Sequence, residues 1–308
     1  MASFMNLPTE LRLVIIRHTL QHRRESPPTP STSNRVYIED FKPIAKRWQL
    51  GGCGVDYEES HNHCPTNCLP LLLTNRQISA ETKSVLSHME TDYVLDISVL
   101  NDIYLFPTWI TVPRLSHRVN HLRAEVRLFG HIITNKAARR QMGDGGRNGI
   151  HFAFHQILQR FLTYGPVGEK KGRDNNGYEN KNISVRVLEL DFTSAEEAFP
   201  FPPEEFDWRD YNRQLIGHGK LEGYKPRPEW MARWICNWIC RILALDSYGI
   251  IYGSMIYENV GTLRVLADGI LIKELDLSHC PDGAVAKREE LGFPVMRPKL
   301  GDQESQNE

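Results

Sequence analysis

The feature that most constrains the fold is a strict alternation of apolar and polar residues between His121 and Phe129. Successive side chains of a strand point to opposite faces of its sheet, so this period of two predicts a strand with one buried and one solvated face. The apolar side chains are Leu122, Ala124, Val126 and Leu128, and the charged ones between them are Arg123, Glu125 and Arg127. The chain must therefore build a half-buried sheet around this segment.

Other segments supply candidate neighbours for this strand. Strand-forming residues alternate or cluster at 36–38, 93–97 and 183–192. Residues 262–267 and 270–277 flank the dipeptide Asp268-Gly269, and this link predicts a hairpin because glycine readily takes the positive φ of a type I′ turn. The similar sequences HLRAEV, VRVLEL and IKELDL recur at irregular spacing. Neighbouring strands of one sheet explain them as well as internal repeats do.

Helical patterns fall at 7–20, 69–89, 150–162 and 229–245. Segments rich in glycine, proline or charge predict loops at 51–67, 165–182 and 198–226. We therefore expect a mixed α+β fold with a mainly antiparallel or mixed sheet. Its expected parts are a helical region at 1–90 with a long inserted loop at 21–68, an α/β body at 91–280 and a mostly flexible tail at 281–308.

Composition narrows the classes of function. Hydrophobic residues make up 41% of the 308 residues and charged residues 24%, which is the balance of a globular protein. The 37 Lys and Arg face 38 Asp and Glu, so no overall basic excess draws the chain to nucleic acid or to an anionic membrane. No window approaches the ~18 consecutive apolar residues of a membrane helix, and Met1 to Leu20 lack the uninterrupted apolar run of a signal peptide. We expect a cytoplasmic or nuclear protein with no nucleic-acid or membrane partner.

The expected N-terminal helix is apolar around most of its circumference. Its apolar residues are Leu11, Leu13, Val14, Ile15, Ile16 and Leu20, which leaves Arg12 and Arg17 as the main polar positions. Such a helix must be covered on more than one side. Two interpretations follow: it is a central helix of the protein's own core, or it is shared between that core and a partner.

Two sequence blocks carry a resemblance to a known family. The segment Leu7-Pro8-Thr9-Glu10-Leu11-Arg12, followed by aliphatic residues, resembles the opening of an F-box. The segment LLLTNRQISAE at 71–81 resembles the second block of that motif, which packs back on the first, and the strand YVLDIS follows it. The layout is similar to that of uncharacterised F-box-like proteins of filamentous fungi. The similarity extends to TSAEEAFPFPP, RPEWMARW and REELGFP, although here residues 21–68 separate the two blocks.

The resemblance implies a function in protein interaction. It implies that the first helix docks on the adaptor subunit of a cullin-type ubiquitin ligase through Leu7, Pro8, Leu11 and Ile15, while the rest of the chain selects a target protein. No catalysis and no cofactor are expected. Two alternatives remain open: a structural scaffold whose degenerate F-box-like helices are plain core, and an enzyme whose site assembles only in the fold.

A cluster of zinc-type donors lies in the inserted loop, at Cys53, His61, His63, Cys64 and Cys68. Zinc needs four nitrogen or sulfur ligands in a tetrahedron, and this loop offers enough donors. The Cys64/Cys68 spacing has no CxxC pair elsewhere to complete it, so we interpret the segment as an ordinary loop without metal.

Two further groups on expected helices are interpreted as structural. His151 and His155 lie four residues apart without the acidic residue of a zinc-protease motif, so we expect a polar or half-buried helix face. Cys236 and Cys240 lie among tryptophans at four-residue spacing, which is typical of core: Trp230, Trp234 and Trp238.

Overall fold

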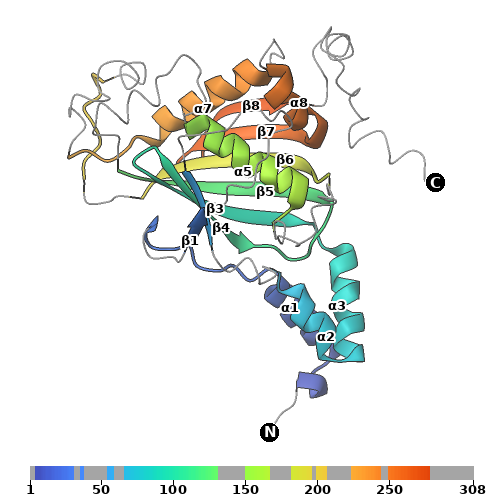
Figure 1. The fold of residues 1–308 in the computed structure, drawn as a ribbon. Helices are drawn as coiled ribbons and strands as arrows, with labels where there is room; N and C mark the ends of the chain where they lie inside the picture. The colour runs from blue at the N-terminus through green and yellow to red at the C-terminus, as the bar shows by residue number, and fades with distance from the viewer. Residues whose placement is uncertain are drawn as a thin grey trace.

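The fold is that of a computed structural model, which describes residues 4–30, 35–37, 54–58, 66–130, 150–166, 182–195, 199–206, 223–243 and 249–277. A mixed sheet forms the body, helices lie over one of its faces, and a separate group of helices lies at one end (Figure 1). The prediction of a mixed α+β fold is confirmed.

The sheet has eight strands in the order β1-β2-β4-β3-β5-β6-β7-β8. Their bounds are β1 (Arg35–Tyr37), β2 (Gly54–Glu58), β3 (Asp92–Leu100), β4 (Tyr104–Thr111), β5 (Arg118–Phe129), β6 (Ser184–Ser194), β7 (Val260–Ala267) and β8 (Ile270–Asp276). Strands β3, β5, β6 and β7 run parallel to one another, while β4 and β8 pair antiparallel with β3 and β7. Parallel strands need crossover connections, and helices provide them between β5 and β6 and between β6 and β7.

The helices form two groups (Figure 1). Helices α5 (Ile150–Tyr164), α7 (Pro228–Leu243) and α8 (Gly249–Asn259) cover one face of the sheet, and α1 (Thr9–Leu20), α2 (Cys68–Thr74) and α3 (Arg76–His88) lie together at its end. No helix in the described part of the chain is long and apolar enough to cross a membrane.

The alternation in β5 sorts its side chains as the sequence predicts. Leu122, Ala124, Val126 and Leu128 are at most 2% exposed and belong to the main core, beneath the helices. The charged residues between them lie on the opposite face, which is lined by polar side chains of β3 and β6 as well. The core therefore occupies a single face of the sheet.

The C-terminal strands are joined by the dipeptide predicted to turn. Ala267 pairs with Ile270, and Asp268 and Gly269 between them have φ angles of 49° and 75°. Positive φ at both central residues is the requirement of a type I′ turn. This conformation costs glycine little because it has no Cβ.

The structure differs from the predictions in four segments: 54–58, 104–111, 249–259 and 69–89. Residues 54–58 are strand β2 rather than loop, because Val55 is buried and pairs in parallel with Leu105 of β4. Strand β4 was not predicted because Pro107 interrupts its pattern, and a proline is tolerated there because the pairing with β2 is limited to Tyr104 and Leu105. Helix α8 was also missed, since a short apolar run does not distinguish a helix from a strand.

The predicted helix at 69–89 is two helices that meet at Asn75. Its backbone is extended, with φ −161° and ψ 170°, and its side-chain Oδ1 accepts a hydrogen bond from the Ile78 amide at 2.9 Å. An Asn side chain that satisfies a free amide of the first turn is an N-cap, so it begins a new helix rather than continuing the old one.

We predict that Asn75→Ala lowers the free energy of unfolding by about 1 kcal/mol, because the Ile78 amide loses its acceptor. Asn75→Asp keeps an acceptor oxygen and should retain most of the stability. Urea unfolding of the three proteins measures the difference. An equal loss in both variants would show that the cap contributes nothing.

Candidate protein-interaction surface

The sequence blocks at 7–20 and 71–81, which are far apart in the sequence, lie against each other. Helix α1 packs on α3 through a cluster of buried residues: Ile16, Leu20, Val85 and Leu86. Leu71 of α2 and Leu13 of α1 pack against this cluster from its edge. The side chain of Asn67 donates to the Thr19 carbonyl oxygen at 3.0 Å, which places the start of α2 beside the end of α1. The three helices therefore form one unit, to which we refer as the helical unit.

A buried ion pair fixes α1 to α3. Arg12, one of the main polar positions of α1, is only 5% exposed. Its Nη2 lies 2.6 Å from Oε1 of Glu81, and its Nε lies 3.1 Å from both carboxylate oxygens. Further donors of the same guanidinium bond the carbonyl oxygens of Met5 and Leu7 and the hydroxyl of Thr9. The Arg12 hydrogen bond lowers the pKa of Glu81, because it favours the charged carboxylate.

The opposite side of α1 is exposed and apolar. Leu11 and Val14 are 51% exposed and Ile15 is 42% exposed. Residues three and four apart lie on one face of a helix, so these side chains form one apolar stripe. Among the residues that the structure describes, α1 is therefore covered on one side only. If α1 were a plain core helix, other parts of the chain would have to cover this stripe. If α1 is shared with a partner, the stripe has to be exposed.

The structure places the four predicted partner-binding residues as follows. Leu11 and Ile15 lie on the apolar stripe, Pro8 precedes the helix and is exposed, and Leu7 is half-buried, its carbonyl oxygen bonded to Arg12. Sequence reasoning did not select Val14, which follows from Leu11 by helical spacing alone. It also missed Leu69 and Leu73 of α2, which are 47% and 75% exposed.

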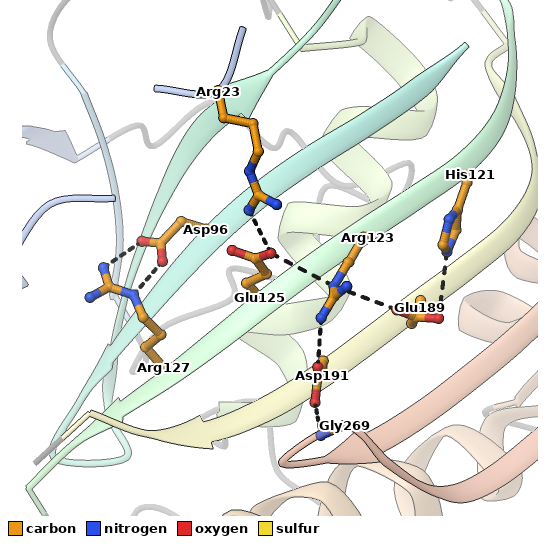
Figure 2. Close-up of polar contacts among 9 residues, drawn as sticks. All are labelled: Arg23, Asp96, His121, Arg123, Glu125, Arg127, Glu189, Asp191 and Gly269. Carbon is orange, nitrogen blue, oxygen red and sulfur yellow. Dashed lines mark hydrogen bonds and ion pairs between the residues drawn. The ribbon is translucent and has the colours of Figure 1, made fainter. Parts of the chain in front are cut away.

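The segment that follows α1 ties the helical unit to the charged face of the sheet. Residues 21–30, here called the connector, cross that face, and Arg23 reaches Glu125 of β5 at 2.7 Å (Figure 2). The Arg24 amide donates to the Ile110 carbonyl oxygen of β4 at 3.0 Å. The Pro27 carbonyl oxygen accepts from Nη2 of Arg127 at 2.8 Å. Three contacts thus hold the connector on β4 and β5.

The register of the sheet explains why the connector carries an arginine. Asp96 of β3 lies opposite Glu125 of β5, which lies opposite Asp191 of β6. Like charges directly opposite each other destabilise a sheet, so this row of three carboxylates needs cations. Arg127 pairs with Asp96, and Arg23 supplies a cation to Glu125 from outside the sheet.

The guanidinium of Arg123 lies between carboxylates of β5 and β6 (Figure 2). Its guanidinium lies 2.9 Å from Asp191, 3.5 Å from Glu189 and 3.7 Å from Glu125. Asp191 also accepts from the Gly269 amide at 3.0 Å, which fixes the β7–β8 turn to β6. Each carboxylate of the row thus has a cation within ion-pair distance. We interpret the network as structural, because its charged groups are paired with one another.

Four of the five zinc-type donors that we interpret as an ordinary loop lie outside the described residues: Cys53, His61, His63 and Cys64. Cys68 is described and half-buried at the start of α2, with its Sγ 3.2 Å from the hydroxyl of Thr66. Within the described ranges, no group of three or more His, Cys, Asp or Glu side chains could hold a metal ion.

His151 and His155 are buried rather than half-buried, which corrects the prediction for this face of α5. Their exposed fractions are 7% and 4%, and burial lowers the pKa of each to about 4 because the imidazolium loses its hydration. Both rings are therefore neutral at pH 7. Cys236 and Trp230 are buried, as predicted, whereas Cys240, Trp234 and Trp238 are only half-buried.

Comparisons of the chain with protein-family models, curated proteins and solved structures returned no match. The geometry of α1 is therefore the basis for interpreting this surface. It combines an apolar stripe of Leu11, Val14 and Ile15 with an opposite side held by Arg12 and the cluster under it.

We predict that the Arg12–Glu81 pair makes stability depend on pH. The pKa of Glu81 is lower in the folded chain than its ordinary value of 4.5. Its contribution is therefore fully present above pH 4.5 and is lost as the pH falls through the lower, folded value. Urea unfolding between pH 7 and pH 3 should show a steeper loss for the wild type than for Glu81→Gln. Parallel pH profiles would contradict the prediction.

We also predict that two ion pairs of the charged row, Arg127–Asp96 and Arg23–Glu125, differ in energy. Arg127→Ala leaves the carboxylate of Asp96, which is 0% exposed, without its cation and should cost about 3–5 kcal/mol of unfolding free energy. Arg23→Ala removes a cation whose side chain is 56% exposed and should cost less than about 1 kcal/mol. Chemical unfolding of both variants measures the contrast, and equal losses would refute it.

Proposed function

We propose that the chain is a protein-interaction protein whose helical unit is F-box-like and docks on the adaptor subunit of a cullin-type ubiquitin ligase. In this proposal the sheet-containing body selects a target protein, and the chain performs no catalysis of its own. The observation that carries the proposal is the exposed apolar stripe of Leu11, Val14 and Ile15 on α1.

The stripe suits recognition of a helix in a groove. In that mode an amphipathic helix lays its apolar face into a hydrophobic groove, with anchors one turn apart. Leu11 and Ile15 have this spacing and are 51% and 42% exposed. Full burial of such a side chain contributes about 1.5–3 kcal/mol, so covering the exposed half of each contributes about 1 kcal/mol.

The hydrogen bonds that hold α1 in place support the same proposal. Arg12 bonds Glu81 and the residues that precede and begin α1, and thereby fixes the position of the stripe relative to α3. Interfaces formed by groups that are already ordered lose less conformational entropy on binding. The stripe is therefore already in a fixed position before it binds a partner.

The long separation of the two blocks is compatible with docking. The blocks are adjacent in space although residues 21–68 lie between them in sequence. The entropic cost of closing a loop rises only slowly with its length. The connector crosses the charged face of the sheet, and its described part leaves Leu11 and Ile15 exposed.

We predict that Leu11→Asp combined with Ile15→Asp weakens binding to the adaptor at least about 30-fold, because two apolar contacts of about 1 kcal/mol each are lost and charges are buried instead. Affinity purification of the tagged full-length chain from extract, followed by mass spectrometry, measures adaptor recovery. Circular dichroism and thermal unfolding of the double variant test whether the fold is retained.

Leu115→Asp provides the matched control. Leu115 is 49% exposed, close to the value for Leu11, but precedes β5 in the body of the protein. The Leu115→Asp substitution also replaces an exposed leucine by a carboxylate, but away from the stripe, and should leave adaptor recovery unchanged. If the wild-type chain retrieves no adaptor, or if Leu115→Asp reduces recovery as much as the double variant does, docking through α1 is wrong.

A further inference from the structure

The helical layer leaves a cavity above the apolar face of the sheet. Its volume is about 50 Å³, and it is bounded by α5, α7 and α8 on one side and by β3, β5, β6 and β7 on the other. Each of these strands contributes at least one side chain to its floor, among them Leu95, Ala124, Leu190 and Leu263. The cavity lies in the body and involves none of the residues of the α1 stripe.

The lining of the cavity is almost entirely hydrocarbon. Its polar atoms belong to His155 and to the indole of Trp238. The Nε2 of His155 lies 3.1 Å from the Tyr252 carbonyl oxygen, and burial keeps the imidazole neutral at pH 7 by lowering its pKa to about 4. A buried water needs two to four polar partners, and apolar cavities of this kind stay dry. The chemistry of the lining therefore favours an uncharged, apolar occupant over water.

Aromatic rings from three helices pack around Trp238 and His155, which line the cavity. Trp238 of α7 lies 5.1 Å from the His151 ring and 5.6 Å from the Phe152 ring of α5. Tyr252 of α8 lies 5.3 Å from the His155 ring. Of the residues that line the cavity, Leu158 and Trp238 are only half-buried, so they lie between the cavity and solvent. Rotation of either side chain offers a route of entry.

The size of the cavity limits the occupant. Protein interiors are packed so closely that few voids exceed a water molecule, and an empty void costs stability in proportion to its volume. An apolar cavity of roughly 150 Å³ in another protein admits benzene or xenon. The present cavity, at about 50 Å³, is smaller than that and suits a compact molecule of few atoms.

We propose that this cavity is a binding site for a small, uncharged, apolar molecule that enters between α5 and α7 beside Leu158 and Trp238. The occupant is held by dispersion contacts with the lining, which an empty cavity lacks. Its chemistry is that of a short hydrocarbon, and a charged or strongly hydrated molecule is excluded because the lining has no charged side chain to compensate for its lost hydration.

Xenon, which is apolar and monatomic, is the probe that tests the proposal. Methyl ¹H–¹³C spectra of the full-length protein, recorded over a series of xenon pressures, should show saturable shifts at Leu95, Leu190 and Leu263. Ala124→Val adds two methyl groups at the floor and should weaken xenon binding at least about tenfold, since the space for its dispersion contacts is filled. Val119→Ile adds volume in the same strand outside the cavity and should leave the shifts unchanged.

Leu158→Phe is the second blocking variant, should Ala124→Val fail to fold. It fills the cavity from its half-buried rim and should reduce the xenon shifts in the same way. Absence of saturable shifts in the wild type, or shifts that persist unchanged in a folded blocking variant, would overturn the proposal. The result is independent of adaptor binding, because both variants leave α1 intact.

Discussion

The register of the central strands places three carboxylates side by side on the face of the sheet opposite the core. Asp96, Glu125 and Asp191 come from β3, β5 and β6, and each lies opposite its neighbour. Sheet arginines compensate part of this charge, and Arg23 of the connector adds a further cation. Arg23 therefore acts together with the contacts of Arg24 and Pro27 to hold the chain that follows α1 on this face of the sheet.

Within the helical unit, Arg12 performs a comparable task. A buried guanidinium has five donors to satisfy, and here they reach Glu81 of α3 and the oxygen atoms of residues that precede or begin α1. The helix is therefore oriented by a directional contact as well as by apolar packing. A helix held in this way can leave Leu11, Val14 and Ile15 exposed without losing its position, and on this the proposed docking depends.

The two faces of the sheet have separate roles. The charged face holds the ion pairs of the carboxylate row and carries the connector, whereas the apolar face carries α5, α7, α8 and the main core. The apolar cavity and the neutral His151 and His155 belong to this second face. Protein docking and small-molecule binding, as proposed, would thus use distant parts of one chain.

The sequence alone was sufficient to predict those features that depend on a few neighbouring residues. The period of two in β5 sorted its side chains between the faces, and Asp268-Gly269 marked the β7–β8 turn because its positive φ angles are a property of the dipeptide. The apolar character of α1 was visible as well. The breaks at Asn75 and Pro107 were harder to interpret, because a cap or a strand proline is understood only from its partners.

The tertiary structure alone decided which neighbours those elements meet. The pairing of Arg12 with Glu81 spans 69 positions in the sequence, and that of Arg23 with Glu125 spans 102, so no local pattern contains either contact. The same holds for the burial of His151 and His155, which depends on Trp238 and Tyr252 from other helices. Periodicity and turn chemistry act over a few residues and so determined strand β5, the β7–β8 turn and the apolar character of α1. Burial, ion pairing and the exposed stripe of α1 arise from contacts between distant segments, which exist only once the chain has folded.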